Sequence, residues 1–269
     1  MNLIKHSLLA FALAGIATSA HAHRPWLYPQ QTLVEAKQAW VTIDGVISEG
    51  LFEVDHVAFK LDKAVITGPD GRTLPTPVPL TGRQRSSIDL QLPLDGTYRI
   101  AIVNRNVMGS YKAANGEQKR FRTTEDDLAK EVPAGVADLK LTRTHQRVET
   151  FVSANKPSDG ALKPSGSGLE LVPLTNPTDL RSGESARWRF TLDGKALPNH
   201  PFSLVPGGVK HRGVLGEIRL TTDANGEANV KLPAAGMYYL SAAFPATRES
   251  APADGRRFSY AATLEILPD

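Results

Sequence analysis

The stretch Ser87–Val103, SIDLQLPLDGTYRIAIV, decides the fold class. Its first six residues alternate polar and apolar side chains, which is the period of a strand with one buried face. The residues PLDG then predict a turn, because Pro fixes φ and Gly tolerates a positive φ. A run rich in β-branched and aromatic residues resumes at Thr97. Similar runs recur about every ten residues without long helical segments between them, so the sequence predicts an all-β protein built from sandwiches.

These runs fall into two groups along the chain. We expect an N-terminal β-sandwich over residues 23–154, a linker over 155–168 and a C-terminal β-sandwich over 169–269. The linker sequence, NKPSDGALKPSGSG, is dense in Pro, Gly and Ser. The N-terminal unit also contains the only helix that we expect, Thr124–Val132, whose first residues are acidic and favour the positive end of the helix dipole. Hairpin turns are expected at Asn115-Gly116, Asp193-Gly194 and Asn225-Gly226.

Residues 1–22 predict a signal peptide. Lys5 supplies a positive start, Leu8–Ala17 an apolar core and Ala20-His21-Ala22 an A-x-A cleavage site. The apolar run is shorter than the roughly 20 residues that span a bilayer, which disfavours the alternative of an uncleaved anchor. No later segment is long and apolar enough to be transmembrane. We therefore expect an exported, periplasmic protein without a stable membrane span.

The composition excludes several classes of chemistry. The 269 residues include no Cys, which rules out disulfides, zinc–thiolate sites, iron–sulfur clusters and thiol catalysis. Lys+Arg 31 against Asp+Glu 28 gives a formal charge of +3, and this near-balance argues against nucleic acid as a partner. The sequence contains no G-x-S-x-G, H-E-x-x-H or glycine-rich nucleotide motif. We therefore expect a binding protein that is not an enzyme and has no organic cofactor.

Cleavage after Ala22 would make His23 the new amino terminus. The α-amine and the ring Nδ1 of a terminal His can chelate one metal ion, and an amine with a reference pKa of about 8 deprotonates readily at neutral pH. One further imidazole completes a set of nitrogen ligands that suits Cu(II), and less selectively Ni(II) or Zn(II). Cleavage after Ala20 would instead give His21-Ala22-His23, a sequence that can wrap square-planar Cu(II) or Ni(II) with its amine, backbone amides and imidazole. Histidine at a signal junction also arises by chance. The sequence therefore leaves open whether this histidine serves a metal site or is there by chance.

His56 is our candidate for the further imidazole, because it falls in the same unit as His23. The neighbouring Asp55 is a candidate to orient the His56 ring without binding the metal itself. For any single internal histidine, however, a structural role is the simpler interpretation, since no two of the five histidines of the mature chain have the i, i+2 or i, i+4 spacing of an obvious site. The weaker metal candidates are His145, His200 and His211.

Several motifs in order carry a family resemblance: His23–Leu27, Glu149–Val152, Gly168–Pro177, Asp193–Pro198, Leu220–Gly226 and Gly236–Tyr238. Together they resemble the domain of unknown function 4198 family, also labelled nickel-uptake (NikM-like) periplasmic proteins. The resemblance covers nearly the whole mature chain. It implies exported proteins of two β domains, the second one transthyretin-like or carboxypeptidase-regulatory-like, and an association with transition-metal uptake. Family members tied to nickel transport often carry a transmembrane segment, which we do not expect here.

These observations predict an exported protein that binds a transition-metal ion through His23 and His56 and supports its uptake or handling. The ion would belong to the Ni, Cu, Co, Fe or Zn class. A cell-envelope transporter or receptor is the expected protein partner. The alternative is a metal-free interaction module accessory to such a receptor or transporter, and carbohydrate binding on a sandwich face is a third possibility. In the alternative, the partner surface would include four aromatic residues: Trp188, Tyr238, Tyr239 and Phe244.

Overall fold

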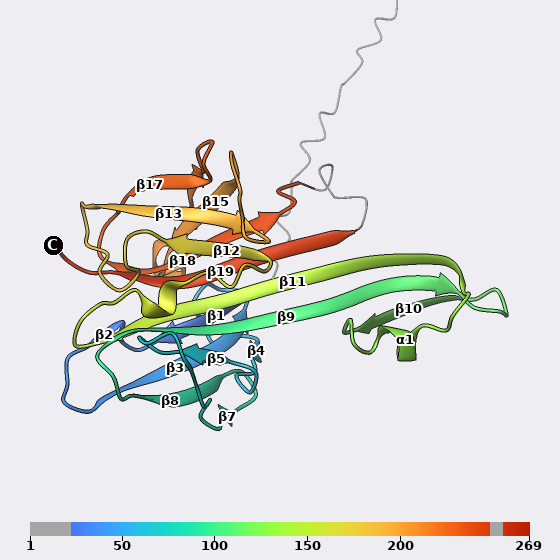
Figure 1. Ribbon diagram of the computed structural model, residues 1–269, viewed down its shortest axis with the longest axis horizontal. Coiled ribbons are helices and arrows are strands. Elements are labelled where there is room, and N and C mark those ends of the chain that lie inside the picture. The colour runs from blue at the N-terminus through green and yellow to red at the C-terminus, as the bar shows by residue number, and fades with distance from the viewer. Residues whose placement is uncertain (1–22, 248–254) are drawn as a thin grey trace, which may run out of the picture.

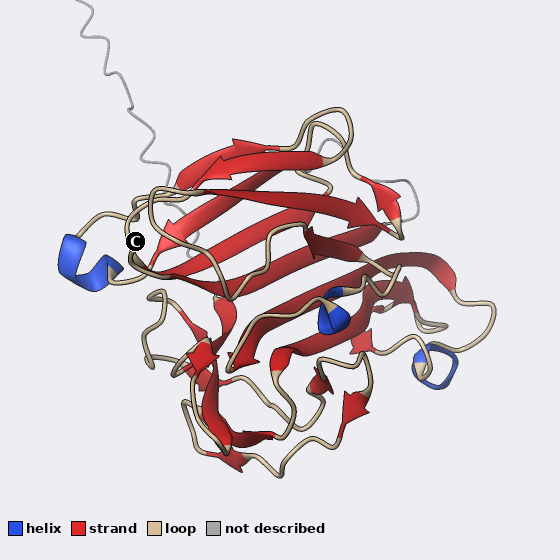
Figure 2. Cartoon of the chain, turned by 60° about the vertical axis from the view of Figure 1, so that its left-hand side comes forward, coloured by secondary structure: helices blue, strands red, loops and turns tan. Residues whose placement is uncertain are grey.

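The computed structural model describes residues 23–247 and 255–269. The predicted signal peptide, residues 1–22, lies outside the described residues. Within them, nearly all regular secondary structure is β-strand (Figure 1, Figure 2). This confirms the predicted all-β class.

The described strands form three sheets. The first sheet contains β1 (Arg24–Pro29), β3 (Ala39–Ser48), β4 (Val57–Ala58), β7 (Leu80–Thr81) and β8 (Ser86–Leu92). The central, ten-stranded sheet contains, in spatial order, β16 (Ile218–Thr221), β15 (Pro201–Pro206), β18 (Gly236–Phe244), β19 (Arg256–Ile266), β11 (Ala137–Ala154), β9 (Gly96–Lys112), β5 (Val65–Thr67) and β6 (Thr73–Leu74). In addition, β10 (Gln118–Thr123) pairs with β9, and β2 (Leu33–Val34) pairs with β11. The third sheet contains β12 (Leu169–Pro173), β13 (Ser185–Leu192), β14 (Lys195–Ala196) and β17 (Glu227–Lys231).

The central sheet lies between the other two and builds a hydrophobic core on each face (Figure 1). Strand β11 serves both cores, because successive side chains of a strand point to opposite faces. Val152 packs in the first core with Ile43 of the first sheet, whereas its neighbour Phe151 packs in the second core with Trp188 of the third sheet. All four side chains are buried. The two sandwiches therefore share one sheet.

The N-terminal and C-terminal halves are joined by parallel pairing of β11 with β19. The register runs from Arg143↔Arg256 to Thr150↔Thr263. Both strands are buried on both faces over much of this pairing, as is usual for parallel strands. The halves are therefore connected by backbone hydrogen bonds within a sheet as well as by the chain between them.

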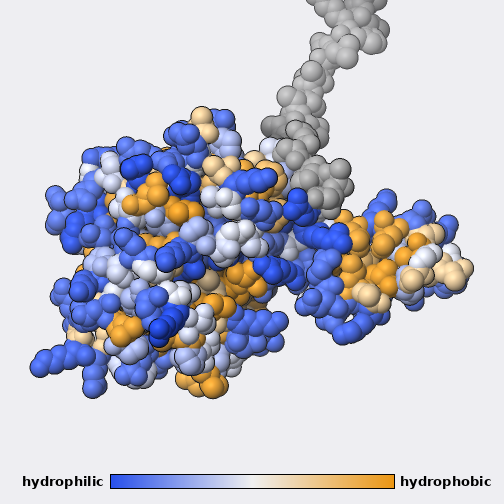
Figure 3. Space-filling view, viewed as in Figure 1, coloured by the Kyte–Doolittle hydropathy of each residue, from blue (hydrophilic) through white to orange (hydrophobic). Residues whose placement is uncertain are grey.

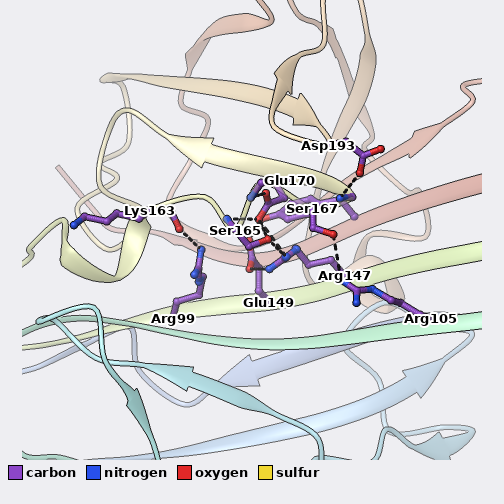
Figure 4. Close-up of polar contacts among 12 residues, drawn as sticks. Arg99, Arg105, Arg147, Glu149, Lys163, Ser165, Ser167, Glu170 and Asp193 are labelled. Atoms are coloured by element: carbon purple, nitrogen blue, oxygen red, sulfur yellow. Dashed lines mark hydrogen bonds and ion pairs between the residues drawn. The ribbon is translucent and has the colours of Figure 1, made fainter. Parts of the chain in front are cut away.

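The segment predicted as a linker, residues 155–168, packs against the fold. It contains a short 3-10 helix, η1 (Gly160–Leu162), in which Ala161 and Leu162 are buried. Beyond this helix, the buried carboxylate of Glu170 accepts hydrogen bonds from the backbone N–H groups of Ser165 and Gly166 at 3.0 and 2.8 Å (Figure 4).

Arginines of the central sheet hold the same segment from the other side (Figure 4). Arg147 of β11 donates to the Ser165 hydroxyl at 2.7 Å and pairs with the Glu170 carboxylate at 3.2 Å. Two arginines of β9 make equivalent contacts, in which Arg99 donates to the Lys163 carbonyl and Arg105 to the Ser167 hydroxyl. Residues 163–168 are thus fixed to both halves of the protein.

Parts of β9, β10 and β11 extend beyond both sandwiches as an arm, residues 105–143 (Figure 1). The arm has a small core of its own, and apolar side chains also gather on its surface (Figure 3). Among the apolar side chains of the arm that are exposed are those of Met108 and Leu139. The buried members of the arm core are Val107, Tyr111, Phe121 and Val132.

The helix expected at Thr124–Val132 is shorter in the structure, where α1 spans only Leu128–Glu131. The residues before it form a turn instead, because the Asp127 carboxylate accepts hydrogen bonds from the Thr124 hydroxyl and the Lys130 ammonium. The other α-helix among the described residues is α2 (Val209–Arg212). No helix within residues 23–247 and 255–269 is long and apolar enough to cross a membrane.

Two of the three predicted hairpin turns are confirmed. Asn115-Gly116 joins β9 to its neighbour β10, and Asp193-Gly194 joins β13 to β14. Asn225-Gly226 also forms a turn, but it connects β16 of the central sheet to β17 of the third sheet. The hairpin prediction at this position is wrong, because turn chemistry fixes the local bend and leaves open which sheet the next strand joins.

Candidate functional site: a histidine–carboxylate cluster

Three residues with metal-ligand side chains meet at the surface. The imidazole rings of His23 and His56 are stacked, with their centroids 4.1 Å apart and their planes 9° from parallel. The His23 Nε2 lies 3.4 Å from the Glu49 Oε1. One ligand atom from each residue falls within 4.8 Å of the others, and all three residues are exposed. We call these residues the His23 cluster.

Strand register explains why these residues meet. Strand β1 pairs antiparallel with β3, so that Arg24 lies opposite Ser48. The residue before Arg24 and the residue after Ser48 therefore leave the sheet side by side, which brings His23 next to Glu49. On the other side of β3, β4 pairs through Ile47↔Val57, and His56 precedes this strand. The His23 cluster thus lies at one end of three neighbouring strands.

The residues between Glu49 and His56 form a loop, here called the 49–56 loop, that is held by its own side chains. The Asp55 carboxylate accepts hydrogen bonds from the backbone N–H groups of Glu49 and Gly50, at 3.1 and 2.8 Å. The Ser48 hydroxyl donates to the Gly50 carbonyl at 2.6 Å. These contacts fix the positions from which Glu49 and His56 project.

A hydrogen bond between β1 and β3 also supports the 49–56 loop. The buried Trp26 indole N–H donates to the Ser48 hydroxyl at 2.7 Å. Trp26 lies on β1, close to His23. The strand that carries one histidine therefore supports the loop that carries the other histidine and the carboxylate.

Two imidazoles and one carboxylate are ligands that suit divalent ions of the first transition row. Metal–ligand bonds of about 2.0–2.2 Å place two ligand atoms of one ion roughly 3–4 Å apart. The ligand atoms of the His23 cluster lie within 4.8 Å, so small rotations of exposed side chains are sufficient to close around an ion. The donor set therefore fits a borderline metal ion.

The family of the chain follows from comparison with known sequences. The profile described as "Domain of unknown function (DUF4198)" matches residues 20–245, which include the whole His23 cluster. The chain belongs to this family. The resemblance deduced from the sequence motifs is thus confirmed.

Other comparisons add little. No curated protein matches the chain. Two solved structures are similar at a low level, the D0-D1 domain of Intimin and the D00-D0 domain of Intimin. They are 9% and 10% identical, cover 90% and 91% of this chain and 97% and 100% of their own chains, and have TM-scores of 0.23 and 0.21. At these TM-scores the similarity supports no statement about function.

The structure thus brings together the two histidines named from the sequence and adds Glu49 to them. Glu49 was missed because its sequence context shows only an acidic residue after a strand. The register of β1 on β3 is the signal that identifies it. Asp55 binds the backbone of the 49–56 loop, so its part in positioning His56 is through the loop and not through a direct contact with the ring.

The other three candidate histidines, His145, His200 and His211, do not join such a cluster. Among the described residues, the His23 cluster is the only group of three or more His, Cys, Asp or Glu residues that has metal-binding geometry. His145 lies in β11 against Gly168, where an added Cβ would come within 2.2 Å of its ring, and burial lowers its pKa. His200 is buried and its pKa is also lowered by burial, whereas His211 is exposed on α2.

The aromatic residues named for the alternative function do not form an exposed surface. Trp188, Tyr238 and Tyr239 are buried, and Phe244 is partly buried against the second core. Burial also raises the pKa of Tyr239. These side chains stabilise the fold, and a partner surface built from them is not available.

Proposed function

We propose that this protein binds a divalent transition-metal ion at His23, Glu49 and His56 and supports its uptake or handling. The observation that carries the proposal is the convergence of two imidazoles and a carboxylate at one end of β1, β3 and β4. Ligands without thiolate favour borderline ions of the Ni, Cu, Co or Zn class and ferrous iron over soft Cu(I). The exposed site allows the ion to exchange, as delivery requires. The role is capture and release, without catalysis.

The proposal includes export to the periplasm through cleavage of the signal peptide after Ala22. Cleavage would free the His23 α-amine, so that the amine and the ring Nδ1 chelate the ion together. The alternative mode uses the Nε2 of His23, the atom that faces Glu49, without the amine. In both modes His56 and Glu49 complete the ligand set, and the state of the amino terminus distinguishes the modes.

The test is a calorimetric titration of the mature protein with Cu(II), Ni(II) and Zn(II), after its amino terminus is determined by intact mass. We expect one ion per chain, and a loss of affinity of about tenfold or more in His56→Ala, because an inner ligand contributes at least as much as its outer supports. Glu49→Gln should weaken binding in the same direction. His211→Ala, which removes an exposed histidine outside the cluster, is the matched control.

The results of this titration distinguish the two binding modes of His23 and test the proposal itself. Binding that is lost when one Ala precedes His23 assigns the α-amine as a ligand, and binding that survives this extension assigns Nε2. The nitrogen couplings in the electron paramagnetic resonance spectrum of the Cu(II) complex report how many nitrogens bind. Equal affinities of the wild type and His56→Ala would contradict the proposal.

A further inference from the structure

A groove of about 510 Å³ adjoins His23 on the open face of the central sheet. Further from His23 on the same face, the first sheet covers three residues that belong to the first core: Val205, Tyr239 and Ala261. The cover ends at the start of β1, and within residues 23–247 and 255–269 no strand of the first sheet covers the face beyond it. There the strands carry small polar side chains, each two positions from one of the covered residues: Ser203, Ser241 and Ser259. The groove exists because these side chains are too small to fill the space above this face.

The wall of the groove carries the guanidinium of Arg24, which forms no ion pair with any described residue. Arg24 lies on β1 next to His23, is partly buried and lines the groove. Within residues 23–247 and 255–269, no hydrogen bond or ion pair joins its guanidinium to another side chain. Across the groove, the carboxylate of Glu217 is paired with Arg219 at 2.9 Å. Among the described residues of the lining, Arg147 and Arg219 have carboxylate partners, whereas the Arg24 guanidinium has none.

Hydroxyl groups on the floor add hydrogen-bonding capacity. Ser203 and Ser241 lie opposite each other in register, and their Oγ atoms are 3.1 Å apart. One of these hydroxyls donates to the other, so the pair keeps one O–H donor for a ligand oxygen. A guanidinium beside serine hydroxyls suits carboxylate oxygens, since Arg binds carboxylates through paired N–H donors.

We propose that this groove binds the organic part of a metal chelate, a small molecule with several carboxylates. The ion would lie at the His23 cluster, and the chelator's free carboxylate would lie on Arg24 and the serines. The inference rests on the proposed metal function, because His23 contributes to both the cluster and the groove. The volume is within the range of small-molecule sites. The cargo is therefore the complex of ion and chelator, which enters and leaves as one unit.

Equilibrium dialysis with radiolabelled citrate tests this inference on the mature protein. We expect citrate to be retained only when Ni(II) is present, in a ratio of one citrate to one ion. Arg24→Gln should weaken citrate retention by about tenfold or more, the loss of one charge-assisted contact, while the affinity for Ni(II) alone stays unchanged. Arg72→Gln is the control, because this arginine is exposed in the turn between β5 and β6.

A second variant tests the groove without changing its charge. Ser241→Val fits a strand position and fills the floor, so it should also reduce citrate retention and leave Ni(II) binding intact. The same experiment with labelled L-histidine, which has a single carboxylate, is the comparison, and retention of L-histidine in place of citrate would contradict a chelator with several carboxylates. Retention of citrate that depends on both Ni(II) and Arg24 supports the inference.

The two proposals fail in different ways. Ni(II) bound without retention of citrate overturns the groove inference and leaves the metal function standing. Chelator retained equally without Ni(II) also overturns it, because the groove would then be a plain anion site. Absence of Ni(II) binding in the wild type overturns the metal function, and the chelate inference with it.

Discussion

His200 is buried beside Phe244, where protonation of its ring is unfavourable. Its Nε2 has no hydrogen-bond partner in the described part of the chain. Burial lowers the pKa of this imidazole below its value in the unfolded chain, which is about 6.5. As the pH falls below that value, the unfolded state takes up a proton that the folded state does not, so stability is lost.

We therefore predict that His200→Gln makes the free energy of unfolding less dependent on pH. Between pH 7.5 and 5.5 the wild type should lose more stability than the variant, measured by urea unfolding at each pH. Burial also lowers the pKa of His145, so the His200→Gln variant should still lose part of its stability as the pH falls. His211→Gln should retain the wild-type difference. An identical pH dependence in His200→Gln and the wild type would contradict the argument.

At the scale of an element, the 49–56 loop decides whether the cluster is preorganised. Asp55→Asn keeps the shape of the side chain but removes the negative charge and one of the two acceptor oxygens. We predict a loss of metal affinity of about tenfold, as for other outer supports of a metal site, with little change in the unfolding midpoint. Asp62→Asn, at an exposed position on the same sandwich, is the matched control. Calorimetry that gives equal affinities for both variants would refute this role of the loop.

Elements with local signals could be predicted from the sequence, and those that depend on distant partners could not. The alternation in Ser86–Leu92 and the Asn115-Gly116 turn reflect local chemistry, and the structure follows both. The turn at Asn225-Gly226 is also local, but its sheet assignment depends on β13 and β15. Glu49 joined the site only through the pairing of β1 with β3. The parallel pairing of β11 with β19 leaves no local signal, since it joins residues as far apart as Thr150 and Thr263.

For the whole molecule, the network around Arg147 connects the two halves. Arg147 lies 3.6 Å from the Glu149 carboxylate and 3.2 Å from that of Glu170, and all three residues are buried. Glu149 also accepts a hydrogen bond from the Tyr260 hydroxyl at 2.7 Å, and burial raises the pKa of its carboxyl group. Arg147 supplies the positive charge between these two buried carboxylates.

We predict that Arg147→Met lowers the free energy of unfolding by about 3–5 kcal/mol, the cost of a buried charge that has lost its partner. The double variant with Glu149→Gln should recover part of the loss, because one of the two carboxylates is then neutral. Arg143→Met on the same strand removes only an exposed pair with Glu125 and should cost about 1 kcal/mol or less. Urea unfolding measures all three variants, and equal losses for Arg147→Met and Arg143→Met would disprove the connection.

The position of β19 also means that the central sheet cannot be completed before the end of the chain is made. This strand follows every other strand in the chain, yet it lies between β18 and β11 in the central sheet. During synthesis, the edge of β11 over Arg143–Thr150 lacks its β19 partner until residues 256–263 are made. Closing a sheet over such a sequence separation is slow. We propose that the chain is exported. Late pairing of β19 with β11 would then keep the polypeptide unfolded, and able to pass through a secretion channel, during its synthesis.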